Sequence, residues 1–471
     1  MGALFDSSLG AVNQVLLFVC LAIALGFEFV NGFHDTANAV ATVIYTNSLR
    51  ASAAVVLSGI CNFIGVFVGG IAVAIGIMQL LPVELLVSKG VGAGLAMVLA
   101  LLLAAISWNL GTWYFGLPAS SSHTLIGSIL GVGVANSLTP GHTFGDGVRW
   151  SKATDIGLSL LVSPLFGFTM AALLVLLVKR YTTNRSLLEP PPKDRPPPPG
   201  TRSLLIATCS GVSFAHGMND GQKGVGLVML ILIGLVPAGF AVNIDATQAQ
   251  VARATQAAHN VAAIVRDHRD AAGATKAEEV LAELGRVERI LEDRKSTAEI
   301  PPDDRFRFRQ QVILADRAIE DMLQAGGLGL TAEEKTKLSA ERKALKELTD
   351  YAPTWVIMAI ALALGIGTMV GWKRIVITVG EKIGKSHLTY AQGAAAEIVA
   401  AGTIGVSSFL GLPVSTTHVL SSGIAGTMVA QQAGLQRSTV RNIGLAWILT
   451  LPATMILSGV FFLIFRKLFG A

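Results

Sequence analysis

Acidic, imidazole and amide side chains gather where the first long apolar run of the chain ends. They are Glu28, Asn31, His34, Asp35 and Asn38. Ionisable groups within an apolar segment are costly in free energy and usually mark a route for substrate or protons. Taken alone, the stretch could also be an ordinary interfacial loop with a helix cap.

The same pattern returns later in the chain. Residues 31–41 (NGFHDTANAVA) align with residues 216–226 (HGMNDGQKGVG), and the two stretches share a glycine, the aspartate and a valine. The second copy holds four polar side chains between apolar flanks: Asn219, Asp220, Gln222 and Lys223. A second polar stretch of this kind makes an incidental loop a weaker explanation.

A second repeated motif offers hydroxyl groups at the start of two helices. Residues 116–125 (GLPASSSHTL) match residues 411–420 (GLPVSTTHVL). A proline after a glycine begins a helix, and hydroxyls in the first turn cap its free amides. The exposed N–H groups and the positive end of the helix dipole bind anions. Six hydroxyls are therefore predicted to face a tetrahedral oxyanion: Ser120, Ser121, Ser122, Ser415, Thr416 and Thr417.

Several of these side chains have alternative roles that the sequence leaves open. Hydroxyls also form hydrogen bonds between membrane helices without binding a substrate. His123 and His418 could cap a hairpin or donate to a substrate. Glu397, within a later apolar run, is either a bundle-facing acid with a partner or a functional one. We group these three residues with Lys223 as candidate supporting residues.

The order and spacing of the motifs indicate a duplication. Asp35 precedes His123 by 88 residues, whereas Asp220 precedes His418 by 198. The excess of 110 residues is close to the length of a soluble insert in the second half. Internal repeats in a membrane chain are typical of transporters whose site lies between the halves. Similarity alone does not say whether the halves are parallel or inverted.

The elements that carry these motifs are long apolar runs. Hydrophobic residues make up 52% of the 471 residues and charged residues 14%, which is a membrane composition. Each run is long enough, or nearly so, to cross a hydrocarbon core of about 30 Å. The runs cover roughly residues 12–30, 53–79, 92–114, 157–178, 225–242, 353–372, 391–410 and 442–465.

Shorter glycine-rich stretches, about 123–137 and 418–432, follow the second motif. They suit half-helices of re-entrant hairpins. We therefore expect an all-α polytopic membrane protein with two homologous repeats, broken helices, re-entrant helical hairpins and a soluble helical insert.

Two polar segments separate the apolar runs of the sequence. A stretch with seven prolines predicts an extended linker, and a later stretch rich in Ala, Glu, Arg and Lys at helical spacing predicts a small helical bundle. The predicted parts are a first transmembrane repeat (1–188), the linker (189–202), the start of the second repeat (203–242), the insert (243–350) and the rest of the second repeat (351–471).

Charge and processing signals favour a multi-pass protein of the cell membrane. The net charge is +5, and short loops with Lys179, Arg180, Lys373 and Arg374 are predicted to lie in the cytoplasm. A bacterial inner membrane is the simplest location. The first apolar run lacks the cleavage site of a signal peptide, so we expect it to be retained.

Other classes of protein fit less well. An ion channel would need a filter-like carbonyl motif, and a membrane metalloenzyme would need clustered His or Cys ligands; neither pattern is present. We expect no enzyme activity, no cofactor and no nucleic-acid partner. Homodimerisation is left open.

At these four motifs the sequence resembles the inorganic phosphate transporter (PiT) family, and in particular its bacterial low-affinity, proton-coupled branch. The family signature is usually Gly-Ala-Asn-Asp in both halves. Here it stands as Gly32 to Asp35, with His34 in third place, and as Gly217 to Asp220. The histidine departs from the general pattern and is similar to the proton-coupled branch.

The resemblance implies an inverted-repeat fold with phosphate held between the hairpin helix starts and the two aspartate segments. Carried over by position, the phosphate contacts are Asp35, Asn38, Asp220, Gln222, Ser121, Ser122, Thr416 and Thr417. Members use sodium or protons, and the bacterial branch moves phosphate as a neutral complex with a divalent metal. The motif does not say which applies here.

Coupling to a cation follows from physics as well. An anion entering a cell works against an inside-negative potential of about 2.3 kcal/mol per charge per 100 mV. Histidine titrates near neutral pH, and burial favours the protonated form of an acid. The candidate coupling residues are Glu28, His34, Asp35, Asn219 and Asp220. Proton symport of phosphate is the preferred reading, with sodium coupling or a sulfate carrier as alternatives.

Overall fold

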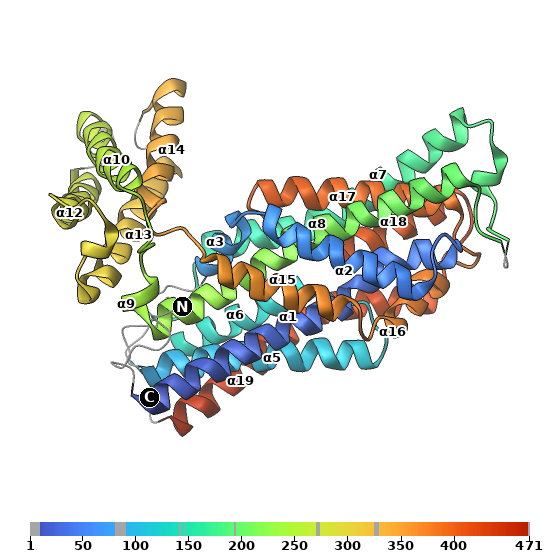
Figure 1. The fold of residues 1–471 in the computed structure, drawn as a ribbon, viewed down its shortest axis with the longest axis horizontal. Helices are drawn as coiled ribbons and strands as arrows, with labels where there is room; N and C mark the ends of the chain where they lie inside the picture. The colour runs from blue at the N-terminus through green and yellow to red at the C-terminus, as the bar shows by residue number, and fades with distance from the viewer. Residues whose placement is uncertain are drawn as a thin grey trace. The chain divides into compact units, whose positions relative to one another are not determined.

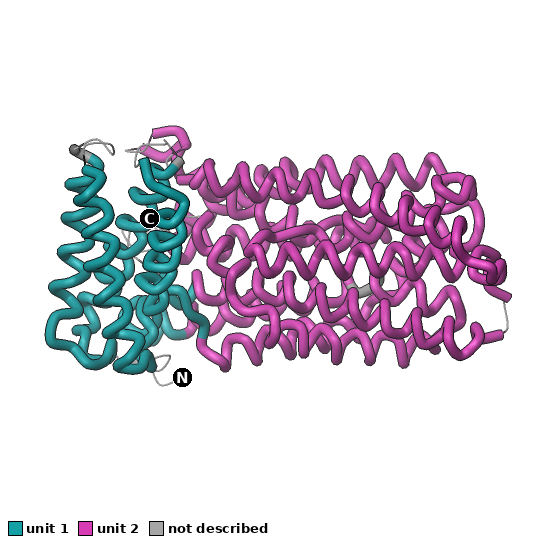
Figure 2. The backbone as a smooth tube through the Cα atoms, turned by 90° about the horizontal axis from the view of Figure 1, so that it is seen from above, with its two compact units in different colours: residues 1–14, 231–352 teal, residues 15–230, 353–471 magenta. Residues whose placement is uncertain are grey.

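The computed structural model describes residues 10–80, 91–140, 143–145, 147–192, 195–269, 274–324 and 329–469. Within these ranges the chain is helical, and its only β-type pairing is an isolated bridge between Gly384 and Leu435. The chain divides into two compact units (Figure 2). One comprises Val15–Leu230 with Pro353–Ala471, and the other comprises Ile231–Ala352 with the first residues through Gln14.

The unit of Val15–Leu230 and Pro353–Ala471, labelled unit 2 in Figure 2, holds the helices of both predicted repeats (Figure 1). Those before the insert are α1 (Ala11–Tyr45), α2 (Ala51–Val68), α3 (Ala72–Met78), α5 (Val91–Tyr114), α6 (Ser121–Ser137), α7 (Trp150–Tyr181), η2 (Arg185–Leu188) and α8 (Pro199–Leu235). Those after it are α15 (Thr354–Thr368), α16 (Lys373–Ile377), η4 (Thr378–Lys382), α17 (Tyr390–Phe409), α18 (Thr416–Ala430) and α19 (Arg437–Leu468).

Among the described residues, five helices are long and apolar enough to cross a membrane: α1, α2, α5, α7 and α19. A sixth span is formed if α15 and the segment Lys373–Lys382, which bend by 56° at a short break, count as one. Many of their large apolar side chains are exposed, as in α19, where Ile448 is 72% exposed and Ile456 is 69% exposed. Such surfaces are stable in lipid and not in water. The predicted polytopic membrane fold is confirmed.

Two short helices begin at the repeated Gly-Leu-Pro motif. α6 has 17 residues and α18 has 15. At 1.5 Å per residue, neither crosses a core of about 30 Å. Gly116 and Gly411 open the preceding turns with φ of 66° and 70°, a conformation that glycine adopts at little cost. The short helices therefore begin about two residues before the predicted starts, and Pro118 and Pro413 precede them instead of forming their first turn, because the hydroxyls of Ser120 and Ser415 are the caps. The relative orientation of the repeats stays a prediction.

Each short helix packs against the last long helix of the other half. α6 lies along α19, and α18 lies along α7. The long partners match, since each has 32 residues and one interior proline, Pro164 or Pro452. Glycines permit the close approach: a Cβ on Gly131 would meet Met455 O at 2.1 Å, and one on Gly426 would meet Phe168 O at 2.2 Å. The halves are interlocked through these two crossings.

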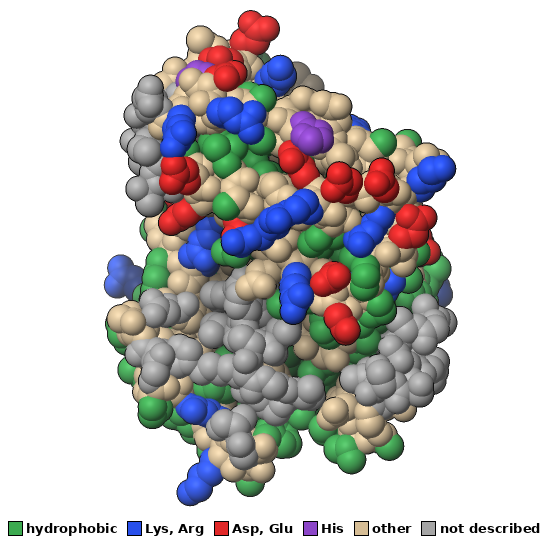
Figure 3. All heavy atoms as spheres, turned by 90° about the vertical axis from the view of Figure 1, so that its left-hand side faces the viewer, with side chains coloured by type: hydrophobic (Ala, Val, Ile, Leu, Met, Phe, Trp, Pro, Cys, Tyr) green, Lys and Arg blue, Asp and Glu red, His purple; other side chains and the backbone are tan. Residues whose placement is uncertain are grey.

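The other unit, labelled unit 1 in Figure 2, is a helical bundle. It consists of α9 (Pro237–Phe240), α10 (Gln248–Asp267), α12 (Ala274–Leu291), η3 (Thr297–Glu299), α13 (Pro302–Gln324) and α14 (Ala332–Lys346). Val261, Leu284 and Phe308 belong to its fully buried core. Basic and acidic side chains intermingle on the face drawn in Figure 3. The segment leaves and returns at one place, because Asn243 N donates to Leu348 O at 2.9 Å.

Candidate functional site

Asp35 accepts hydrogen bonds from the first turns of both short helices. Each short helix packs against the helix before it, and we call these pairs, α5 with α6 and α17 with α18, the two hairpins. Asp35 belongs to α1 and is 4% exposed. Ser121, at the start of α6, donates to its Oδ2 at 2.7 Å, and Thr417, in the first turn of α18, donates to its Oδ1 at 2.8 Å. Thr416 donates at 3.5 Å, and His34 Nδ1 lies 3.0 Å from Oδ1. The two predicted helix starts therefore converge on one carboxylate.

Asp220, on α8, stands on the other side of Ser121. It is fully buried, and Ser121 donates to its Oδ2 at 3.2 Å. Lys223 Nζ lies 2.6 Å from its Oδ1, an ion pair one helical turn apart. The same ammonium donates to Ser122 Oγ at 2.5 Å and to Val414 O at 3.2 Å. Lys223 thus supplies a positive charge between the two hairpin starts.

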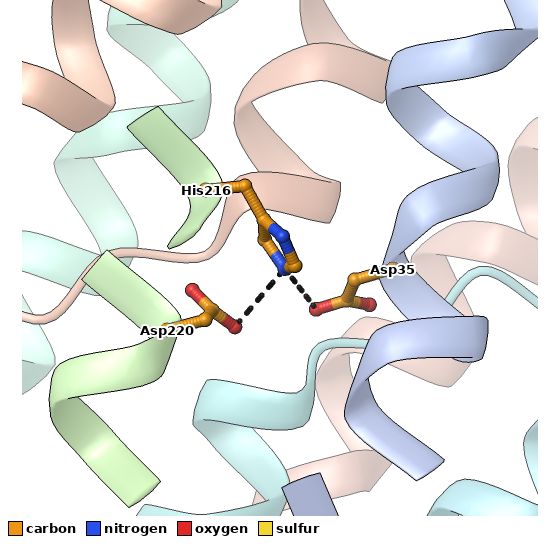
Figure 4. Close-up of side chains that lie close together, drawn as sticks. All are labelled: Asp35, His216 and Asp220. Atoms are coloured by element: carbon orange, nitrogen blue, oxygen red, sulfur yellow. Dashed lines mark ion pairs between the residues drawn. The ribbon is translucent and has the colours of Figure 1, made fainter. Parts of the chain in front are cut away.

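His216, which the sequence analysis did not single out, completes this group (Figure 4). Its Nε2 is 4.0 Å from Asp35 Oδ2 and 3.6 Å from Asp220 Oδ2, while its Nδ1 lies 2.9 Å from Asn62 Oδ1. One ligand atom each from His216 and the two aspartates lie within 4.8 Å of one another. Its place one turn before Asp220, opposite Asn31 in the alignment, was the available signal.

The residue before each aspartate holds the long arm of a hairpin. His34 Nε2 lies 3.1 Å from Thr112 Oγ1 on α5. In the second copy, Asn219 donates to Ser408 Oγ on α17 at 3.1 Å and accepts from Val414 N at 3.2 Å. His34 therefore touches both Asp35 and a hairpin, whereas Asn219 is bound to a hairpin alone among its described contacts.

The side chain of Gln222 forms hydrogen bonds with the backbone at the break between α2 and α3. Its Oε1 accepts from Val73 N at 2.7 Å, and its Nε2 donates to Gly69 O and to Met218 O. These bonds occupy both ends of the amide. Asn38, which the alignment places opposite Lys223, also belongs to the predicted set of phosphate contacts, and its side chain lies outside the described residues.

Ser120 and Ser415 are the N-caps of α6 and α18. Their hydroxyls accept from His123 N at 3.2 Å and from His418 N at 3.1 Å. The two histidine rings lie against each other with centroids 4.4 Å apart, and His418 stacks on Trp447 at 4.0 Å. The predicted supporting histidines thus join one hairpin to the other.

The two remaining predicted acids are buried in different places. Glu28 Oε2 accepts from Asn31 Nδ2 at 3.2 Å, and the same amide donates to Asp220 Oδ2 at 3.4 Å. Glu28 is therefore linked to the central group. Glu397 instead receives the hydroxyls of Thr42 and Thr208, from α1 and α8. Thr42 is seven residues beyond Asp35, about 10 Å along the helix.

A small cavity of about 10 Å³ lies beside this group. Asp35, Ser58, Asn62, His216 and Thr416 are among its lining residues. That volume holds about one water-sized group. Hydroxyls at two helix starts can bind oxyanion oxygens, and the carboxylates and imidazoles can hold protons or a cation.

A buried charged site between broken membrane helices is typical of membrane transporters. The chain belongs to the phosphate transporter family, whose model matches residues 31–458. The chain is 46% identical to the low-affinity inorganic phosphate transporter PitA of Escherichia coli (strain K12), over 94% of this chain and 95% of that protein. It is 40% identical to a low-affinity inorganic phosphate transporter of Buchnera aphidicola subsp. Acyrthosiphon pisum (strain APS), over 95% of this chain and 96% of that protein.

A solved structure described as a sodium-dependent phosphate transporter has the same fold. Its TM-score is 0.56 at 19% identity, and the match covers 96% of this chain and 99% of that one. The family and the named relatives are phosphate transporters and the chain has several spanning helices, so it is a multi-pass membrane transporter and not an enzyme.

Proposed function

We propose that this chain imports inorganic phosphate across a bacterial inner membrane by proton symport. The anion is held by the first turns of α6 and α18, beside Asp35 and Asp220. The observation that carries the proposal is the Asp35 carboxylate, which receives Ser121 and Thr417 hydroxyls from the two hairpins. A carboxylate oxygen and a phosphate oxygen are the same kind of acceptor, so these donors suit either.

The acids favour phosphate over sulfate. Sulfate is fully ionised at neutral pH and offers only acceptor oxygens, which two carboxylates would repel. Phosphate keeps at least one hydroxyl at neutral pH, and this hydroxyl can donate to Asp35 or Asp220. The relatives named as phosphate transporters support the same choice.

Proton coupling rests on the titratable groups around the site. His34 lies 3.0 Å from Asp35, and His216 lies 3.6 Å from Asp220. A proton on either pair removes one negative charge beside the incoming anion. It also offsets the inside-negative potential, about 2.3 kcal/mol per charge per 100 mV.

A divalent metal travelling with phosphate is the second part of the proposal. Asp35, His216 and Asp220 offer two carboxylate oxygens and an imidazole nitrogen within 4.8 Å of one another. Oxygen and nitrogen donors of this kind bind Mn²⁺ or Zn²⁺, and Mg²⁺ through the carboxylates. The metal would be cargo, carried as a neutral complex with the anion. Sodium is the alternative cation, since the structural neighbour is described as sodium-dependent.

Uptake of radiolabelled phosphate into proteoliposomes tests the proposal, with the pH gradient, sodium and magnesium varied one at a time. We expect uptake that requires the pH gradient, rises with the divalent metal and ignores sodium. A requirement for sodium would overturn proton coupling, and no phosphate uptake would overturn the substrate.

Asp35→Asn is the decisive variant, because it keeps the shape of the side chain and removes its charge. We expect uptake to fall at least about tenfold, as for loss of charge-assisted hydrogen bonds. Asp155→Asn, at an exposed position of α7, is the control. Wild-type uptake with unchanged pH dependence in Asp35→Asn would contradict the role of Asp35.

A further inference from the structure

We propose that the headgroup of an anionic phospholipid binds a basic groove where α19 begins. The basic groove is lined by Lys385, Val429, Leu435, Arg437, Val440 and Arg441. It lies apart from the buried site, and the argument for it does not depend on the transported substrate.

The groove concentrates positive charge that the protein itself does not neutralise. Lys385, Arg437 and Arg441 are all exposed, and none forms an ion pair with a described carboxylate. Three cations so close together repel one another, and an anion between them relieves this repulsion. Basic pockets between the ends of membrane helices suit phosphate-bearing headgroups for this reason.

The frame of the groove is set by bonds between two segments. Gly384 and Leu435 form a bridge, Lys385 N donates to Gly434 O at 3.1 Å, and Gln436 N donates to Ile383 O at 3.0 Å. The groove is therefore preformed, which lowers the entropy cost of binding.

The start of α19 adds to the attraction for an anion. Gln436 is its N-cap, but the side chain makes no capping bond and instead donates to Gly384 O at 2.9 Å. The positive end of a helix of 32 residues thus borders the same groove as Arg437 and Arg441.

The surface next to the groove is apolar and suits an acyl chain. Beyond Arg441, the exposed face of α19 continues with Leu445, Ile448 and Ile456, which are 49%, 72% and 69% exposed. From Leu445 to Ile456 the helix rises about 16 Å, close to half of a hydrocarbon core of about 30 Å. Cations at one end and an apolar stripe one leaflet long match a diacyl phospholipid.

The same apolar rim argues against a free anion as the occupant. Val429 and Val440, both lining residues, are 48% and 38% exposed. Inorganic phosphate gains nothing from these side chains, whereas a lipid covers them. We therefore assign the groove to a lipid headgroup and leave free phosphate as an outcome of the test.

The full-length protein, purified in detergent and stripped of lipid, is titrated with phosphatidylglycerol and separately with phosphatidylcholine. Native mass spectrometry gives the dissociation constant of each lipid, and Tm is followed in parallel. We expect phosphatidylglycerol to bind more tightly and to raise Tm. Lys385→Gln, Arg437→Gln and Arg441→Gln should each weaken its binding about fivefold, the usual effect of one basic residue at an anionic surface.

Lys179→Gln, at the exposed end of α7, is the matched control and should bind as wild type does. Unchanged binding in all three single variants would overturn the proposal. Equal protection by inorganic phosphate at the same concentration would overturn it too, since the groove would then be a free-anion site.

Discussion

Ser121 has a hydroxyl within hydrogen-bonding distance of both acids of the site. Its hydroxyl lies 2.7 Å from Asp35 Oδ2 and 3.2 Å from Asp220 Oδ2. A hydroxyl has a single proton, so it donates to one acid at a time and can turn from one to the other or to a substrate oxygen. The hydroxyl of Ser121 should therefore donate to whichever of the two acids carries the negative charge.

Ser121→Ala should weaken phosphate binding without unfolding the protein. A hydrogen bond to a charged group is worth about 1.5–3 kcal/mol, so KM for phosphate should rise about tenfold or more. Uptake rates over a range of phosphate concentrations measure this. Ser128→Ala, two turns along α6 and bonded to Thr124 O, is the control. Equal KM values for the two variants would contradict the assignment of Ser121.

Asp316 predicts how the insert responds to pH. Burial opposes ionisation of this carboxyl, but Lys346 and Arg342 outweigh burial and hold its pKa below the usual range. A depressed pKa in the folded state stabilises that state above the unfolded pKa, about 3.9. The contribution is lost as the pH falls through the folded pKa.

Asp316→Asn should therefore destabilise the insert at pH 7, by about 3 kcal/mol for a broken buried pair. The difference from wild type should shrink below about pH 4, where the carboxyl of the unfolded chain begins to protonate, and vanish below the folded pKa. Hydrogen exchange of α13 amides in the full chain, corrected for intrinsic rates, measures the loss of stability at pH 7 and its decrease at lower pH. Asp304→Asn, at an exposed pair with Arg307, should change little. A loss that is the same at every pH would contradict the linkage.

At the scale of the helices, the close crossing of α6 and α19 constrains the site. A Cβ on Gly131 would meet Met455 O at 2.1 Å and Ser458 Oγ at 2.3 Å. The Met455 carbonyl belongs to the backbone of α19, so a side chain at position 131 fits only if the two helices move apart. Because α6 carries Ser121, any separation shifts the site.

Gly131→Val should lower both Tm and the yield of monodisperse protein, as an overpacked core does. Size-exclusion chromatography and thermal unfolding in detergent measure the effect. Gly157→Val in α7, where a Cβ meets nothing within 4 Å, is the matched control. Identical behaviour of the two variants would show that the crossing tolerates side chains.

Local chemistry explains which elements could be predicted from the sequence. The half-helices were expected near residues 123 and 418, and they begin at Ser121 and Thr416. Capping hydroxyls and a preceding proline act within one turn, so a short motif is enough. The aspartates could be predicted for a similar reason, because an acid within an apolar membrane segment must face the interior of the bundle or a polar cavity.

Long-range contacts explain what the sequence did not show. One apolar run, residues 53–79, was expected to cross in one piece, but it breaks between α2 and α3. Gln222, far along the chain, holds the amide of Val73 at that break. His216 escaped notice for a similar reason, since only folding brings it beside Asp35, 181 residues away.

At the scale of the whole molecule, the insert and the transport unit should be separable. Every described residue of the candidate site belongs to Val15–Leu230 or Pro353–Ala471. Asn243 N and Leu348 O are 2.9 Å apart, so a few glycines and serines can replace residues 244–347. Phosphate uptake by the deleted protein should stay within about threefold of wild type, with Asp35→Asn in the same background as the inactive control. Loss of uptake in well-folded protein would assign the insert a part in transport.

The exchange of partners between the two hairpins and the last helix of each half also sets an order of assembly. α6 packs on α19, a helix that is synthesised long after it. Until then the glycine face of α6 has no helix to lie against, although α5 and α6 are already made. A chain that stops before Arg437 therefore ends with its first hairpin bare in the membrane. The packing around α6 is thus complete only after α19 has been made, and a copy truncated before Arg437 exposes the glycine face of α6 to the quality-control proteases of the membrane.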